Sequence, residues 1–133
     1  MPRSTLTPSD RDLLKAPNFC HVAVPRDDGT IQTVVVWCDL DGDDQVVLNS
    51  AEGRSWPANL RRAGRATVTV MNMDNPLEYV SIVGRLVEDT HDGADDTINA
   101  LSHKYDGTDY DLQPGQQRVT FRLAPERITH RGG

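Results

Sequence analysis

Residues 49–62 read NSAEGRSWPANLRR, and this segment indicates the end of a strand, a turn at Gly53 and the start of a helix. The helix is expected over residues 55–63, because Pro57 is tolerated in a first turn and Gly64 suits a left-handed C-cap. The first N–H groups of a helix are unpaired, and the helix dipole favours negative charge beside them. Arg54 adds a guanidinium that can pair with two phosphate oxygens. The segment therefore predicts either an anion site, with a phosphorylated cofactor as the first hypothesis, or an ordinary strand-to-helix connection with solvated arginines.

Short strands joined by tight turns surround this helix. Asp28 and Gly29 form a strong hairpin signal, and β-branched residues mark the strands beside it. Gly84 interrupts the longest expected strand and predicts a bulge or a close approach of two chain segments. Six or seven strands are expected, over residues 19–24, 31–38, 45–49, 65–71, 77–88, 118–123 and 127–130, and three helices over residues 8–15, 55–63 and 93–105.

The connections between these elements indicate the fold class. Strands joined mainly by hairpins, with helices inserted at only two internal points, favour an antiparallel barrel over a parallel sheet. The predicted fold is mainly β (α+β), an antiparallel split β-barrel with short peripheral helices. The chain has the size of one domain, residues 1–133, in which residues 1–12 form an N-terminal arm and the start of the first helix. A barrel this small is filled by its own side chains, so a large planar ligand is expected in a groove outside it.

Composition and charge exclude several classes of function. The net charge of −6 and the pI near 5.0 oppose binding to nucleic acid. No apolar segment approaches the roughly 20 residues that a membrane helix needs, and residues 1–7 lack the apolar core of a secretory signal. We therefore expect a cytoplasmic protein without nucleic-acid or membrane partners. Cys20 and Cys38 are expected to be free thiols, and no histidine pair has the spacing of metal ligands.

The arginines are unevenly distributed along the chain. Arg54, Arg61, Arg62 and Arg65 lie within twelve positions of an otherwise acidic sequence. This contrast favours a local anion site over a general polyanion surface. Arg61 and Arg62 are expected to solvate the exposed face of the helix, which leaves Arg54 as the candidate anion ligand.

Several segments together resemble a known family. They are the hairpin with Trp37, the segment 49–62, the strand 78–85 and the closing elements at residues 118–119 and 125–127. In their order and spacing, from about Leu13 to His130, the chain resembles the flavin and deazaflavin oxidoreductases of the pyridoxamine-phosphate-oxidase-like split barrel. The resemblance implies a fold of the FMN-binding split-barrel type and a homodimer with each cofactor at the subunit interface. At this chain length it also implies the deazaflavin coenzyme F420.

The resemblance also implies which residues hold the cofactor. The phosphate would lie at Arg54 and the N–H groups near Ser55, and the ring would lie along residues 33–37. Hydride would pass directly between the deazaflavin and a bound acceptor, so no nucleophile or base is required and the catalytic residue is unknown. The cofactor-binding residues implied in this way are Thr33, Val34, Val35, Val36, Trp37, Asn49, Ser50, Gly53, Arg54, Ser55, Trp56 and Asn59.

The sequence departs from the family pattern at two places. Trp56 stands where many relatives carry a lysine, so its indole would either stack on a cofactor or substrate or cover the barrel edge. Ile31 and Val35 stand where relatives often have prolines, which gives this strand backbone donors that a proline would remove. Phosphate affinity and the contacts of the ring could therefore differ from those of relatives.

Three functions remain open. The leading prediction is an F420-dependent oxidoreductase that transfers a hydride from the reduced deazaflavin to an unsaturated or conjugated small molecule. An FMN-dependent flavoprotein similar to pyridoxamine-phosphate oxidase is the alternative with the same fold, since both cofactors carry a tricyclic ring and a phosphate. A cofactor-binding or ligand-binding protein without turnover is the third. The loops at residues 71–76 and 106–116 are expected to form the wall that faces an acceptor, and they do not identify the substrate.

Overall fold

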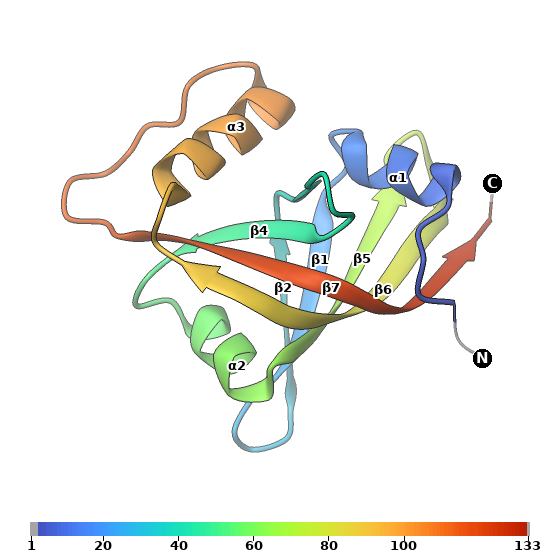
Figure 1. Ribbon diagram of the computed structural model, residues 1–133, viewed down its shortest axis with the longest axis horizontal. Helices are drawn as coiled ribbons and strands as arrows, with labels where there is room; N and C mark the ends of the chain where they lie inside the picture. The colour runs from blue at the N-terminus through green and yellow to red at the C-terminus, as the bar shows by residue number, and fades with distance from the viewer. Residues whose placement is uncertain (1–2, 133) are drawn as a thin grey trace.

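Strands are the main regular secondary structure of the computed structural model, which describes residues 3–132. Residues 1–2 and 133 of the predicted domain lie outside the described residues. The strands are β1 (Cys20–Pro25), β2 (Ile31–Val36), β3 (Asp39–Leu40), β4 (Val46–Ala51), β5 (Arg65–Asn72), β6 (Asn75–Thr90) and β7 (Arg118–Arg131). The helices are α1 (Pro8–Lys15), α2 (Ser55–Ala63) and α3 (Ala94–Asp106) (Figure 1). Within residues 3–132, none of these helices combines the length and the apolar character that crossing a membrane requires.

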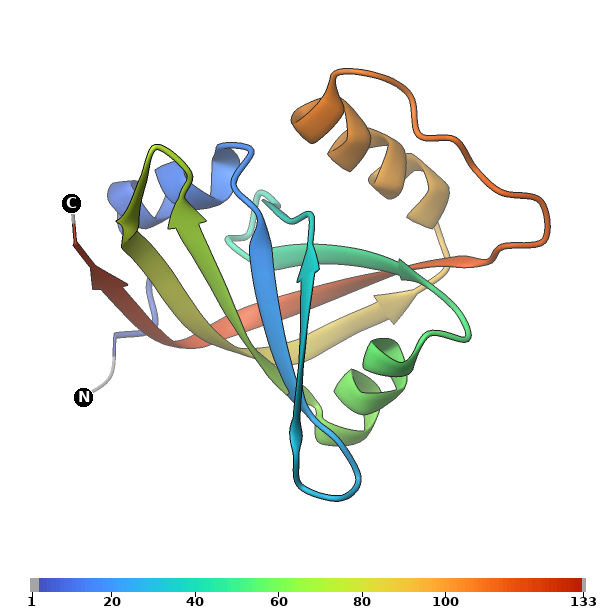
Figure 2. The same ribbon diagram turned by 180° about the vertical axis from the view of Figure 1, so that it is seen from behind.

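The seven strands form one antiparallel sheet in the order β2-β1-β5-β6-β7-β4-β3. Figures 1 and 2 show that the sheet curls strongly, so that β4 and the long strands β6 and β7 run across the direction of β1 and β2. The edge strands β2 and β3 do not pair with each other, so the barrel is split. The predicted antiparallel split β-barrel with short peripheral helices is therefore confirmed.

The inner face of the curled sheet forms the hydrophobic core. Phe121 of β7 is fully buried there, and α2 adds Trp56 and Leu60 to the same cluster. Full burial of each large apolar side chain contributes about 1.5–3 kcal/mol. Cys20 and Cys38 are buried in this core as free thiols. No group of three or more His, Cys, Asp or Glu side chains in residues 3–132 could hold a metal ion.

The connection into and out of α2 has the predicted geometry. Gly53, in the turn before the helix, has φ +94°, and Gly64, after it, has φ +73°. Both angles lie in the left-handed region that favours glycine. The N–H of Gly64 donates to the carbonyl of Leu60 at 2.7 Å and closes the helix. The predicted helix over residues 55–63 and its C-cap are therefore confirmed.

Gly84 allows β6 and β7 to cross closely. A Cβ added at this position would lie 2.8 Å from the Cβ of Leu123, and the register shifts between Val83 and Gly84. The bulge and the close approach predicted from the sequence are both present. Pro125 pairs with Gly84 at this irregularity, where a missing N–H is tolerated. For this reason the two segments expected over 118–123 and 127–130 are one continuous strand, β7.

The N-terminal segment is fixed beside the end of β7. The side chain of Thr7 accepts a bond from the N–H of Asp10, and the Asp10 carboxylate accepts one from the N–H of Thr7 at 2.8 Å, so α1 begins at Pro8 with a capping box. Asp10 is fully buried and also pairs with Arg3 and with His130 of β7. Through Asp10, Arg3 is held against the start of α1, and α1 is held against the end of β7.

Candidate functional site

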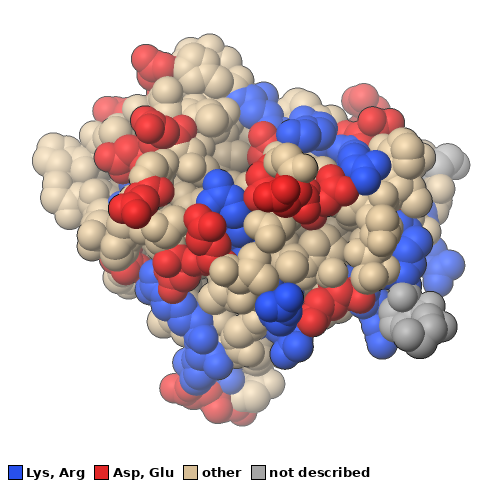
Figure 3. All heavy atoms as spheres, in the orientation of Figure 1, with Lys and Arg blue, Asp and Glu red and all other residues tan. Residues whose placement is uncertain are grey.

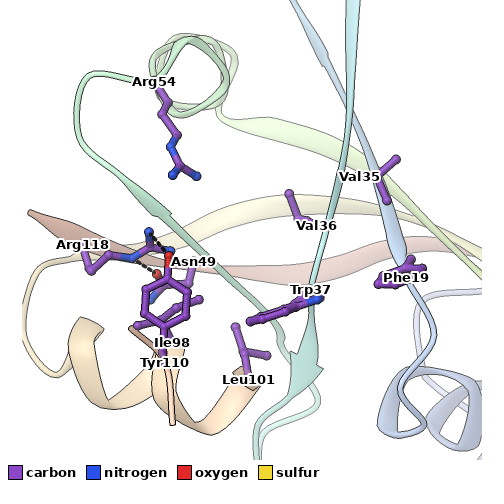
Figure 4. A pocket seen from close by; sticks show the side chains of 10 residues that line it. All are labelled: Phe19, Val35, Val36, Trp37, Asn49, Arg54, Ile98, Leu101, Tyr110 and Arg118. Atoms are coloured by element: carbon purple, nitrogen blue, oxygen red, sulfur yellow. Dashed lines mark hydrogen bonds between the residues drawn. The ribbon is translucent and has the colours of Figure 1, made fainter. Parts of the chain in front are cut away.

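A groove lies outside the barrel, between the end of β2, β4, the start of α2 and α3 (Figure 4). Its volume of about 320 Å³ is at the lower end of the range for ligand sites. Most of its lining is apolar and comes from Phe19, Val35, Val36, Trp37, Ile98 and Leu101. Its polar end is formed by Asn49, Arg54, Tyr110 and Arg118. The groove therefore combines a hydrophobic slot with two guanidinium groups.

Arg54 stands at the polar end of the groove with its charge unpaired. It is the N-cap residue of α2, and its exposed side chain makes no hydrogen bond or ion pair within residues 3–132. Figure 4 shows it pointing from α2 towards Arg118 and Asn49. The unpaired N–H groups of the first turn of α2 lie next to it in the chain. This end of the groove is therefore suited to an anion.

The two other arginines of α2 are held by carboxylates. Arg61 pairs with Asp89 at 2.7 Å and with Glu52 at 2.9 Å, and the bond to Asp89 is the main cause of its raised pKa. Arg62 pairs with Asp27 at 2.8 Å. Arg61 and Arg62 lie on the exposed face of α2, as expected, and the sequence did not indicate that carboxylates pair with both. Figure 3 shows that basic and acidic side chains are intermixed on one face of the molecule.

Arg118 is a second cation of the groove, and it is buried. Its exposed fraction is 4%, and its hydrogen-bond partners are neutral. Nε donates to Oδ1 of Asn49 at 2.9 Å, and Nη1 donates to the hydroxyl of Tyr110 at 3.4 Å and to Oε1 of Gln116 at 3.3 Å. The guanidinium also lies over the ring of Tyr110, 5.1 Å from its centre. Burial lowers the pKa of Arg118 and the charge of Arg54 acts in the same direction, whereas Tyr110 and Asp95 oppose this shift.

Asn49 holds Arg118 in place. Its Nδ2 donates to the carbonyl of Ala94 at 3.0 Å and to Oγ1 of Thr120 at 3.1 Å, so Oδ1 is directed at Arg118. These bonds join β4 to β7 and to the start of α3. Because the amide is fully occupied, Asn49 positions the guanidinium and has no free donor for a ligand.

A stack of aromatic rings supports the apolar wall of the groove. Trp37 stacks on Tyr105 with the ring centres 5.4 Å apart, and Tyr105 stacks on Phe19 at 5.9 Å. The hydroxyl of Tyr105 donates to the carbonyl of Asn18 at 2.6 Å and accepts from the N–H of Cys38 at 3.1 Å. Burial raises the pKa of Tyr105, so the hydroxyl stays protonated. The indole of Trp37 is therefore held as a rigid surface.

Five of the twelve residues expected at a cofactor site line this groove: Val35, Val36, Trp37, Asn49 and Arg54. The remaining seven lie close by in the sequence but do not line it. Thr33 is exposed, Val34 packs against the core, and Gly53 forms the turn before α2.

The polar residues of this second group have other partners. Ser50 is fully buried and alternates with Asn49 along β4, so its side chain points to the opposite face of that strand. The hydroxyl of Ser55 accepts a bond from Gln32 at 2.8 Å, and the amide of Asn59 donates to Gln32 at 2.7 Å. Ser55 and Asn59 therefore tie α2 to β2.

Trp56 differs from the expectation of a groove residue. It is 5% exposed, belongs to the hydrophobic core and packs against Phe121, with the ring centres 5.6 Å apart. The reason is its place in the first turn of α2, on the face that also buries Leu60. The sequence left open whether Trp56 stacks on a cofactor or substrate or covers the barrel edge. In the structure its indole packs at the barrel edge.

Sequence reasoning missed five residues of the lining: Phe19, Ile98, Leu101, Tyr110 and Arg118. Tyr110 belongs to the loop 106–116, which was expected to face an acceptor. The other such loop, 71–76, lies elsewhere, since Met71 and Pro76 line a separate hollow. The sequence did show Arg118 as a charged residue at the start of a strand in which polar and apolar residues alternate, and this could have marked it as a candidate. Its partner Asn49 could not be identified, because the pairing of β4 with β7 is long-range.

No protein-family model matches the sequence, and no curated protein sequence matches it significantly. Solved structures do match. One named F420 reductase is similar with a TM-score of 0.82 and 23% identity, covering 93% of this chain and 98% of that chain. A putative pyridoxamine 5'-phosphate oxidase from Listeria innocua has a TM-score of 0.67 and 16% identity, with 90% and 92% covered. A FAD-binding protein from Mesorhizobium loti has a TM-score of 0.68 and 17% identity, with 98% and 97% covered. At these identities the likeness establishes the fold, which is that of the split barrels.

Proposed function

We propose that the groove binds a phosphorylated tricyclic cofactor and that the protein is an oxidoreductase. The leading candidate is an F420-dependent reductase of an unsaturated or conjugated small molecule, and FMN is the alternative cofactor. The observation that carries the proposal is the unpaired guanidinium of Arg54 at the start of α2, beside an apolar groove with an aromatic wall. The similar structures named F420 reductase and pyridoxamine 5'-phosphate oxidase support the choice of cofactor class.

The residues present fit such a cofactor at both of its ends. Arg54 and the N–H groups at Ser55 would hold the phosphate, and Val35 to Trp37 would lie against the ring. The bound cofactor would supply hydride chemistry. The protein would contribute binding, orientation and the exclusion of water by the apolar side chains of β2 and α3.

We further propose that two copies of the chain form a homodimer that closes the groove. Ile31 and Val35 of the edge strand β2 are 58% and 59% exposed, and Val35 also lines the groove. Two further hollows with apolar side chains lie on strands β1, β2, β5 and β6. An exposed apolar edge of this kind is usually covered. Light scattering should give the mass of two chains, and Ile31→Glu should shift it towards one; a monomeric wild type at micromolar concentration would contradict the proposal.

Titration of the protein with F420 and with FMN, followed by fluorescence, tests the cofactor assignment. The proposal expects saturable binding of at least one, with F420 bound more tightly. Tighter binding of FMN would instead identify the protein as an FMN-dependent flavoprotein. Binding of either cofactor without oxidation of its reduced form by any conjugated acceptor would favour a cofactor-binding protein without turnover. Failure of both to bind would overturn the proposed function.

A further inference from the structure

Arg118 is the buried arginine of the described residues, and within them its guanidinium forms no ion pair and bonds only to neutral groups. The carboxylate of Asp95, at the start of α3, acts on its charge without pairing with it. Its bonds to Asn49, Tyr110 and Gln116 use Nε and Nη1. Nη2 has no hydrogen-bond partner within residues 3–132, although the side chain lines the groove. A buried ion without a directly paired counter-ion is costly, because neutral partners replace only part of its hydration. The groove therefore presents a fixed cation with donors still available.

The surroundings of Arg118 differ from those of Arg54. Arg54 is exposed and belongs to the start of α2, where backbone N–H groups add to its attraction for phosphate. Arg118 comes from β7, and in Figure 4 it lies near Tyr110 and Ile98, below Arg54. The adjoining lining consists of the apolar side chains of Ile98 and Leu101, with Trp37 beyond them. The unpartnered Nη2 of a fixed guanidinium beside an apolar slot fits an oxyanion on an apolar body.

We propose that Arg118 binds the carboxylate of an aromatic or conjugated small molecule whose planar body lies in the apolar part of the groove. This inference rests on the proposed function, because the acid would be the molecule that the cofactor reduces. It narrows the substrate class from conjugated molecules in general to conjugated acids. Asn49 contributes by holding the guanidinium in place before the ligand binds, which lowers the entropic cost of binding.

Calorimetric titration of the protein without cofactor tests this subsite, with trans-cinnamate as the probe and its neutral amide, cinnamamide, as the isosteric comparison. Cinnamate should bind at least about tenfold more tightly than cinnamamide. Arg118→Met should lower cinnamate affinity about ten- to hundredfold and leave cinnamamide affinity nearly unchanged. Arg122→Met is the matched control, since Arg122 lies four residues along the same strand outside the groove. It should leave both affinities unchanged.

A second variant keeps Arg118 and supplies an internal anion. Gln116 already accepts a bond from Nη1, so Gln116→Glu places a carboxylate beside the guanidinium. It should weaken cinnamate binding several-fold by competition. Equal affinity for cinnamate and cinnamamide, or cinnamate binding unaffected by both variants, would overturn the inference.

Titration with the cofactors separates this inference from the proposed function. Arg118→Met should leave F420 and FMN affinity within about threefold of wild type, whereas Arg54→Ala should weaken it far more. If Arg118→Met weakens cofactor binding as much as Arg54→Ala does, Arg118 belongs to the phosphate site and the inference fails. If neither cofactor binds but cinnamate binds through Arg118, the carboxylate subsite stands and the proposed function fails.

Discussion

Arg118 and Arg122 occupy the same face of β7, four residues apart, yet they have opposite environments. Arg122 pairs with Asp41 at 3.1 Å and with Glu88 at 2.7 Å. Arg118 is more deeply buried and has neutral partners. Arg122 connects β7 to residues beside β3 and in β6, whereas Arg118 faces the groove. The two arginines therefore differ in their partners: carboxylates pair with Arg122, and neutral groups bond to Arg118.

This difference separates an arginine that stabilises the fold from an arginine that is available to bind an anionic ligand. A paired arginine contributes to stability through its carboxylates, and its removal leaves them facing each other. An unpaired arginine costs free energy in the empty protein and recovers it when an anion binds. The same distinction holds for the arginines of α2 and its N-cap: Arg61 and Arg62 are paired, whereas Arg54 has no partner among the described residues.

The largest effect on stability is expected at the paired arginine. Arg122→Met should lower the free energy of unfolding by about 1–2 kcal/mol, because Asp41 and Glu88 lose a shared, partly buried partner. Arg118→Met should change it by no more than about 0.5 kcal/mol, since the relief of a buried charge offsets the bond lost by Asn49. Urea denaturation of the two variants measures both values. A loss at Arg118 as large as that at Arg122 would remove the distinction between the two residues.

A smaller effect is expected at His130, a paired cation that can be titrated. Burial alone would lower the pKa of His130, but its bonds to Asp10 and Glu78 raise it above the ordinary value. The stabilisation of the folded state by protonated His130 is therefore complete below the unfolded-state pKa of about 6.5. It is lost as the pH rises through the folded-state pKa. Urea denaturation should show stability falling over that window in wild type, and His130→Gln should flatten this slope. An unchanged slope would mean that the carboxylates do not hold the protonated imidazole.

Most of the fold follows from local signals in the sequence. The turn glycines and Pro57 predicted the position of α2, because Gly64 has the left-handed conformation that ends a helix. Gly84 predicted the close crossing of β6 and β7, because only a residue without Cβ fits against Leu123. The continuity of β7 through Pro125 was not predicted, since it depends on the bulge in the partner strand.

The site was predictable only in part, because it depends on long-range contacts. Arg54 could be identified from its position before a helix. The roles of Asn49 and Arg118 could not, because they arise from the pairing of β4 with β7 and from the docking of α3. The packing role of Trp56 likewise depends on Phe121, which is distant in the sequence.

The most direct test of the central claim is the cofactor affinity of wild type and Arg54→Ala, measured by fluorescence titration at low salt. Arg54→Ala should weaken cofactor binding by about 1.5–3 kcal/mol, roughly ten- to hundredfold, because a charge-assisted contact with the phosphate is lost. Arg62→Ala is the control on the same helix, since Arg62 pairs with Asp27 and does not line the groove. Equal affinity of wild type and Arg54→Ala, with unchanged circular dichroism, would contradict the anion site and the cofactor assignment that depends on it.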